Sequence, residues 1–219
     1  MPTLSVKPPA DPLVWFASRP GQALLAAEQP RLEAFLRHGL PAQPWLWLGP
    51  LPAEGDGTAL PPRGLRLQRV GHGLRGALDC RLPLPLAIES VGTVVIQHIL
   101  DMEGMEALLA ECARVLQPGG RLLMFALNPW SGYRLRWRES GLSALRGDAW
   151  RHRLQGAGLT LADTGRGSTL GPAWSVRQDD AADALRPWRA VNVFQAEKRT
   201  LAAIPPEARP YWQAGAAVA

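Results

Sequence analysis

The chain has 219 residues, of which 47% are hydrophobic and 20% charged, so one well-filled domain is expected and a largely disordered chain is excluded. Its formal net charge is +5, and nearly all of the basic residues are arginine, because Lys7 and Lys198 are the only lysines. No stretch approaches the roughly 18 apolar residues of a membrane span, and the first residues lack the apolar run of a signal peptide, so a cytoplasmic protein without a membrane segment is expected.

The two cysteines, Cys80 and Cys112, are too few to form a metal site alone, and no Cys-x-x-Cys pair occurs, so no metal site is expected. A disulfide between them is not expected in a reducing cytosol, and both are interpreted as small buried apolar residues. The basic balance permits a polyanionic partner. Arginine in place of lysine, alongside abundant Ala, Leu, Gly and Pro, is also explained by codon bias in a GC-rich genome, and this is the favoured interpretation.

The N-terminal third predicts a leader, a helix and two strands. Residues 1–19 hold prolines at positions 2, 8, 9 and 12 and are expected to form an irregular leader. Apolar residues recur at helical spacing over 21–38, and Pro30 is expected to kink or split that helix. A buried strand is expected at 45–48, and a half-exposed strand at 65–70.

Residues 77–80 predict a brief third strand, and residues 91–99 predict the strongest strand of the chain. In the second segment, Val94, Val95 and Ile96 form an apolar run without polar alternation. Such a run is typical of a strand that is covered on both faces in a parallel sheet.

A helix is expected over 102–116, with Asp101 as its N-cap. The Pro-Gly-Gly sequence at 118–120 ends it, and residues 121–127 predict another buried strand. Strand, helix and strand in this order predict a right-handed βαβ unit.

Beyond Asn128 the pattern is looser. The expected pieces are a helix at 146–156, a short strand at 159–163, an irregular glycine-rich insertion at 164–188 and a last strand at 191–196. Together these elements predict one domain over 20–200, followed by a C-terminal tail over 201–219.

Three motifs occur in a definite order in the middle of the chain. They are Leu84-Pro85-Leu86, a strand that ends near His98, and Leu116-Gln117-Pro118-Gly119-Gly120-Arg121-Leu122. In this order they resemble the middle of a class I S-adenosylmethionine-dependent methyltransferase of the type 11 kind. The resemblance implies an α/β, Rossmann-like fold with a mostly parallel central sheet, helices on both faces and an antiparallel last strand.

Four further anchors extend the resemblance over roughly residues 19–200. Small bacterial methyltransferase-like proteins of this group carry a Pro-Gly-x-x-Leu-Leu-x-x-Glu helix, a strand ending in Leu-Gly, an Asn-Pro-Trp-Ser segment and an Ala-x-Lys-Arg segment. The matching segments here are 20–28, 46–49, 128–131 and 196–199.

The resemblance also implies S-adenosylmethionine as cofactor, bound where the parallel strands end, and an acceptor pocket beside it. The acceptor itself is not identified, and a small molecule is expected. The residues implied for the cofactor are Gly49, Asp79, Cys80, Gln97 and His98, and those implied for the acceptor are Asn128 and Trp130.

The chain departs from the family pattern at the first two strands. Gly49 is followed by Pro50 and Pro52 in place of a Gly-x-Gly loop, and the strand at 65–70 ends without the carboxylate that usually holds the ribose. These departures favour a second hypothesis, in which the fold is catalytically silent and binds or scaffolds a protein partner or a second copy of itself.

Methyl transfer uses an already activated sulfonium, so an enzyme of this kind supplies mainly alignment and, for some acceptors, a base. The sequence assigns no catalytic base. His98 is the best-placed candidate for the pocket, and a partly buried structural histidine is an equal alternative.

A third hypothesis, nucleic-acid binding, rests on residues 130–153, where aromatic residues alternate with arginines. Stacking and guanidinium charge hold single-stranded nucleic acid in this way. Glu139 and Asp148 dilute the charge, so a solvated amphipathic segment or a partner surface is the favoured interpretation.

Overall fold

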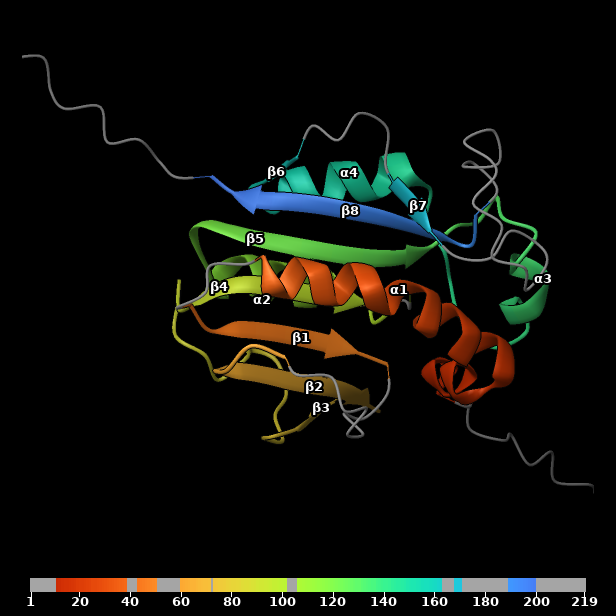
Figure 1. Ribbon diagram of the computed structural model, residues 1–219, viewed down its shortest axis with the longest axis horizontal. Coiled ribbons are helices and arrows are strands. Elements are labelled where there is room, and N and C mark those ends of the chain that lie inside the picture. The colour runs from red at the N-terminus through yellow and green to blue at the C-terminus, as the bar shows by residue number, and fades with distance from the viewer. Residues whose placement is uncertain are drawn as a thin grey trace, which may run out of the picture.

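The computed structural model describes residues 11–38, 43–50, 60–71, 73–101, 106–162, 168–170 and 189–199 (Figure 1). The helices are η1 (Pro12–Ala17), α1 (Arg19–Arg37), α2 (Glu106–Val115), α3 (Arg134–Trp137) and α4 (Gly147–Gly156). The strands are β1 (Trp45–Gly49), β2 (Gly64–Val70), β3 (Gly73–Gly76), β4 (Val91–Gln97), β5 (Leu116–Leu127), β6 (Leu159–Leu161), β7 (Ser168–Leu170) and β8 (Val191–Lys198). None of the described helices is long and apolar enough to cross a membrane.

The described strands form one mixed sheet in the order β3-β2-β1-β4-β5-β8-β6, with β7 also paired to β8. The four central strands β2, β1, β4 and β5 are parallel, and β8 runs antiparallel to β5. Val95 lies opposite Leu123, so the segments at 91–99 and 121–127 are neighbouring parallel strands. This confirms the expected Rossmann-like architecture with an antiparallel last strand.

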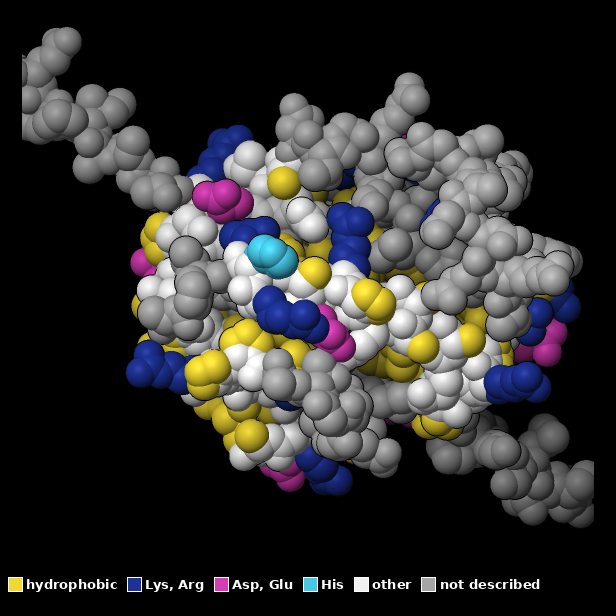
Figure 2. All heavy atoms as spheres, viewed as in Figure 1, with side chains coloured by type: hydrophobic (Ala, Val, Ile, Leu, Met, Phe, Trp, Pro, Cys, Tyr) yellow, Lys and Arg dark blue, Asp and Glu magenta, His cyan; other side chains and the backbone are white. Residues whose placement is uncertain are grey.

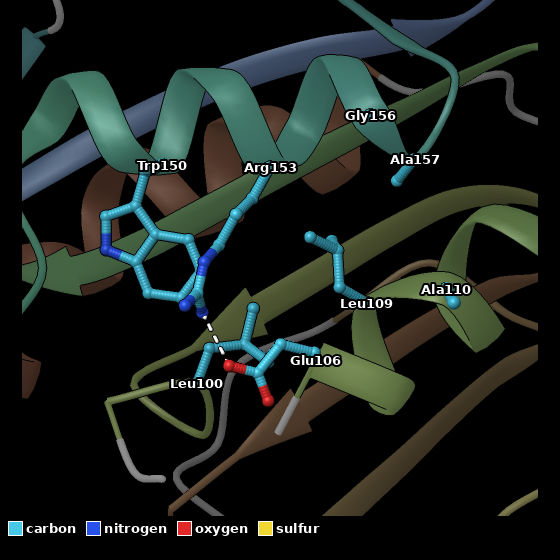
Figure 3. A pocket seen from close by; sticks show the side chains of 8 residues that line it. All are labelled: Leu100, Glu106, Leu109, Ala110, Trp150, Arg153, Gly156 and Ala157. Atoms are coloured by element: carbon cyan, nitrogen blue, oxygen red, sulfur yellow. Dashed lines mark ion pairs between the residues drawn. The ribbon is translucent and has the colours of Figure 1, made fainter. Parts of the chain in front are cut away.

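Helices cover both faces of the sheet: α1 lies on one face, and α2 and α4 lie on the other (Figures 1 and 3). Every residue of β1 and of β4 is buried. Burial on both faces explains the continuous apolar runs of these two strands, because neither face of a covered parallel sheet meets water.

The third strand differs from the prediction. The expected strand at 77–80 is wrong, because the strand next to β2 is β3, which pairs with it antiparallel. Gly71 has a positive φ of 57°, a conformation that glycine adopts without strain, and the chain reverses there directly after β2. Cys80 forms only an isolated antiparallel bridge to Leu74 on β3, on the side of β3 that faces away from β2.

The N-terminal part is more regular than predicted. The structure forms the 3-10 helix η1 inside the segment expected to be irregular, and it buries Leu13 and Phe16 of this helix in the core. Helix α1 begins after the N-cap Ser18 and runs as one helix of 19 residues with Pro30 inside it, so Pro30 does not split it.

Candidate functional site

The parallel strands β1, β2, β4 and β5 end at the same edge of the sheet, where η1, the start of α1 and α3 lie (Figure 1). In open α/β sheets ligands bind outside the carboxyl ends of such strands. The sequence-predicted site residues are therefore described from this edge.

His98 follows the last residue of β4 and is fully buried at this edge. Its φ of 56° is left-handed, which turns the chain out of the strand direction. Its ring nitrogens lie 2.7 Å from Oε1 of Glu28 on α1 and 2.8 Å from Oδ2 of Asp101. Both carboxylates are fully buried as well, so the imidazole has a protein partner on each side.

Gln97 extends this cluster. Its Nε2 donates to Oε2 of Glu28 at 2.7 Å, and its Oε1 accepts from Nε1 of Trp47 on β1 at 3.3 Å. The side chains of Gln97 and His98, both predicted to line the cofactor, therefore make hydrogen bonds inside the protein. We call Glu28, Gln97, His98 and Asp101 the buried polar cluster.

Asp101 was expected to cap a helix that starts at 102, but residues 102–105 lie outside the described residues, and α2 is described from Glu106. Oδ2 of Asp101 accepts from the backbone N–H of Leu127 at 2.9 Å in addition to the contact with His98. The cluster therefore joins α1, the end of β4 and the end of β5. Oδ1 of Asp101 has no hydrogen-bond partner among the described residues.

The cluster sets the ionisation of its members. Burial by itself lowers the pKa of His98, but the charges and hydrogen bonds of Glu28 and Asp101 outweigh it and raise this pKa from 6.5 to about 9. Burial raises the pKa of Asp101, and the contacts with His98 act in the opposite direction. At neutral pH the imidazole is therefore a cation held between two carboxyl groups.

Aromatic residues close the edge above the cluster. The ring of Phe16 stacks on the imidazole of His98, with centroids 4.7 Å apart. Nε1 of Trp15 donates to the carbonyl of Arg136 at 2.9 Å, and the hydroxyl of Tyr133 donates to the carbonyl of Pro20 at 2.6 Å. These contacts join the N-terminal segment to the segment that follows β5.

Gly49 ends β1 beside the cluster and is buried. A Cβ at this position would lie 3.2 Å from Nε1 of Trp47 and 3.6 Å from Oε1 of Gln97. Side chains of the protein therefore occupy the space on this side of Gly49.

Asp79 and Cys80 lie elsewhere, at the end of β2 and along β3. They line a hollow of about 510 Å³. The hollow is bordered by Val70, Gly73, Leu74, Arg75, Asp79, Cys80 and Arg81. The carboxylate of Asp79 is 67% exposed and lies 3.3 Å from Nε of Arg75. Cys80 is a free thiol whose pKa is raised by partial burial and by the charge of Asp79.

Asn128 and Trp130 lie apart from this hollow, after β5. Oδ1 of Asn128 accepts from the backbone N–H of Trp130 at 3.1 Å, and its Nδ2 donates to the carbonyl of Arg189 at 2.8 Å. Asn128 thus forms the turn that ends β5. The side chain of Trp130 is 62% exposed, and the guanidinium of Arg146 lies 5.6 Å from its ring.

The aromatic residues of 130–153 are mostly unavailable for stacking on a ligand, because Tyr133, Trp137 and Trp150 are all buried. Trp130 is the one tryptophan of this segment that remains exposed. On the face shown in Figure 2, basic side chains are scattered and acidic ones lie among them. This arrangement gives the nucleic-acid hypothesis little support.

Glu28 and Asp101 are the members of the cluster that sequence reasoning missed. A signal for Glu28 existed, because it stands four residues after Leu24 and four before Leu32 on the buried face of α1. A carboxylate inside an apolar stripe requires a buried partner.

Comparison with solved structures defines the class of fold. The chain matches geranyl diphosphate C-methyltransferase from Streptomyces coelicolor, solved with Mg²⁺, geranyl diphosphate and S-adenosyl-L-homocysteine, with a TM-score of 0.52 and 14% identity over 77% of each chain. It matches an S-adenosylmethionine-dependent methyltransferase from Mesorhizobium loti with a TM-score of 0.52 and 11% identity over 78% of this chain and 97% of that one. The chain therefore has the Rossmann-like fold of class I methyltransferases.

A third match is a chain from the complex of the Haloferax volcanii methyltransferase activator Trm112 with its partner protein. Its TM-score is 0.53 at 12% identity, over 87% of this chain and 98% of that one. No protein-family model and no curated protein sequence matches the chain.

Proposed function

We propose that this protein is an S-adenosylmethionine-dependent methyltransferase of the type 11 kind that acts on a small-molecule acceptor. The observation that carries the proposal is the hollow at the carboxyl end of β2, in a sheet with the class I methyltransferase fold. Its volume of about 510 Å³ is within the roughly 300–1,000 Å³ of small-molecule sites. Two of the residues implied for the cofactor, Asp79 and Cys80, line it.

The described residues fit the adenosine half of the cofactor. Asp79 offers an exposed carboxylate beside the end of β2, and a carboxylate accepts hydrogen bonds from an adenine amine or from ribose hydroxyls. The strand itself ends at Val70 and carries no carboxylate there, so Asp79 is the acidic residue that borders the hollow. When bound, the cofactor supplies an activated methyl group, and the task of the chain is to align it with the acceptor.

The described side chains fit the methionine half of the cofactor less well than the adenosine half. Gln97 and His98 are committed to the buried polar cluster, and the space beside Gly49 is occupied by Trp47 and Gln97. A residue that is fully buried with both ring nitrogens engaged cannot serve as a base toward an acceptor, so we assign no catalytic base.

The poor fit to the methionine half favours a second candidate function, a protein with the methyltransferase fold that binds a partner without catalysis. The buried polar cluster seals the ends of β1 and β4 with protein side chains. The Haloferax volcanii match belongs to a complex with an activator protein, so this fold also occurs in protein assemblies.

Isothermal titration with S-adenosyl-L-homocysteine tests the proposal. We expect binding by the intact chain, and we expect Asp79→Asn to weaken it about tenfold or more, because a charge-assisted hydrogen bond is lost. Asp148→Asn, which alters an exposed carboxylate on α4, should leave the affinity unchanged.

The absence of both heat and thermal stabilisation at about 1 mM ligand would exclude the enzyme and favour the silent fold. If S-adenosyl-L-homocysteine binds the Asp79→Asn variant as tightly as the parent chain, the protein binds the cofactor, but the hollow at β2 is not the site.

A further inference from the structure

A second hollow lies between α2 and α4, on the face of the sheet opposite α1 (Figure 3). Its volume is about 220 Å³. Its lining is mainly apolar and consists of Leu100, Glu106, Leu109, Ala110, Trp150, Arg153, Gly156 and Ala157. None of these residues borders the hollow at β2, so the two hollows are separate.

The hollow has two chemically different ends. At one end Nη1 of Arg153 lies 2.9 Å from Oε1 of Glu106, and this ion pair links α4 to α2 (Figure 3). At the other end Ala110, Gly156 and Ala157 leave room because their side chains are small or absent (Figure 3). A ligand that matches this shape has a charged group at one end and an apolar body.

The charge of the ligand's group depends on which side chain of the ion pair stays in place when the ligand binds. If Arg153 stays and Glu106 leaves, the ligand's group is an anion. The guanidinium of Arg153 lies 5.5 Å from the ring of Trp150, a contact that does not depend on Glu106. Glu106 is the first residue of α2, and its side chain is 59% exposed, so it can turn toward water. An exposed ion pair contributes little, so an incoming carboxylate can replace Glu106 at low cost.

We propose that this hollow binds a small amphipathic carboxylate, such as an aryl ring or a short alkyl chain that carries one carboxylate. The carboxylate takes the place of Glu106 on Arg153, and the apolar body lies against Leu109 and Trp150. A cavity of about 150 Å³ lined by apolar side chains can hold benzene. The volume of about 220 Å³ therefore accommodates a ring with a short chain.

The probes for the test are 3-phenylpropanoate and its neutral amide, 3-phenylpropanamide, titrated by ligand-observed NMR. We expect the carboxylate to bind with a Kd of about 1 mM or below, in keeping with ligands of this size. The amide should bind about fivefold more weakly. Arg153→Gln should remove this difference, whereas Glu106→Gln should strengthen carboxylate binding about threefold, because the competing side chain is gone.

Gly156→Leu tests the location. Gly156 lines the hollow, and a Cβ at this position would meet no other atom within 4 Å, so a larger side chain can be accommodated there and should weaken the binding of both probes. Arg151→Gln is the matched control for Arg153→Gln and should leave the binding of both probes unchanged. Arg151 is on the same helix but pairs with Asp148 outside the hollow.

Three results would overturn the proposal: no carboxylate binding up to about 10 mM, equal binding of carboxylate and amide, or unchanged binding in Gly156→Leu. Thermal unfolding of each variant identifies any that fails to fold. In that case the Glu106→Gln result decides, because Glu106 is exposed and its replacement leaves the core intact.

Discussion

The imidazole of His98 lies between two carboxyl groups in a fully buried position, with Glu28 on α1 and Asp101 after β4. Placing charges in an apolar interior is costly unless each is paired and hydrogen-bonded. Among the described residues, Phe16, which stacks on the ring, is uncharged, and the groups that raise the pKa of His98 are the carboxyl groups of Glu28 and Asp101.

This arrangement predicts a pH dependence of stability. The pKa of His98 is about 9 in the folded protein and 6.5 in the unfolded chain. The protonated imidazole therefore contributes its full stabilisation of the fold below pH 6.5, and this stabilisation is lost as the pH rises through 9. The free energy of unfolding should fall by up to about 3 kcal/mol across this window. Urea unfolding at a series of pH values measures it.

Glu28→Gln is the control for this prediction. The substitution removes the neighbouring negative charge that raises the pKa of His98, so the decline between pH 6.5 and 9 should be shallower. If the decline is equally steep in the variant, the pH dependence has another source.

At the scale of elements, the pairing of β1 with β2 depends on a glycine. Gly64 lies opposite Trp45, whose indole Nε1 donates to the carbonyl of Pro61 at 3.0 Å. A Cβ at Gly64 would lie 1.8 Å from Cζ2 of this indole. The indole therefore occupies the space that a side chain on β2 would need.

Gly64→Ala should lower the free energy of unfolding by about 1–3 kcal/mol, because the indole must move from its packed position. Gly156→Ala is the opposite case: Gly156 is the last residue of α4 and has open space around it, so the change should stabilise the fold by about 0.4–1 kcal/mol by restricting the unfolded chain. Urea denaturation compares both with the parent chain. A Gly64→Ala variant as stable as the parent would contradict the packing described here.

The connection between α2 and β5 shows how an element forms from its surroundings. The strand is expected at 121–127, after the Pro-Gly-Gly sequence at 118–120, yet β5 begins at Leu116 and includes these three residues. Gly119 adopts a φ of 73°, which allows the local bend within the strand. Pairing of Leu116 with Val91 on β4 starts the strand early.

At the scale of the whole molecule, the N-terminal segment and the segment after β5 hold each other across the carboxyl edge of the sheet. The hydroxyl of Tyr133 donates to the carbonyl of Pro20, and the ring of Tyr133 meets that of Trp15 edge to face at 6.4 Å. Segments more than 100 residues apart in sequence thus close the same edge, and their stability should be linked.

Tyr133→Phe tests this link. Loss of one hydrogen bond should cost about 1 kcal/mol, and amide hydrogen exchange should become faster in η1 and the first turns of α1. Ser140→Ala, which removes a hydrogen bond to the carbonyl of Trp137 within the same segment, should leave exchange in η1 unchanged. Equal exchange in Tyr133→Phe and the parent would show that the two segments are independent.

The central strands could be predicted from the sequence because their signal is local. The apolar run at Val94, Val95 and Ile96 reflects burial on both faces, and each residue of β4 carries that signal by itself. The position of His98 at the carboxyl edge followed from the same reasoning, since parallel strands end together. The antiparallel β3 was missed because its four residues, Gly73–Gly76, include two glycines and carry little strand propensity, so pairing with β2 forms the strand.

The contacts that the side chains at the carboxyl edge make were decided by the tertiary structure. His98 and Glu28 are 70 residues apart, and only the packing of α1 over the sheet brings them to 2.7 Å. The sequence by itself therefore determined the class of fold and the edge where a site would lie. Whether the side chains at that edge face a ligand or one another depends on long-range packing, which no local pattern encodes.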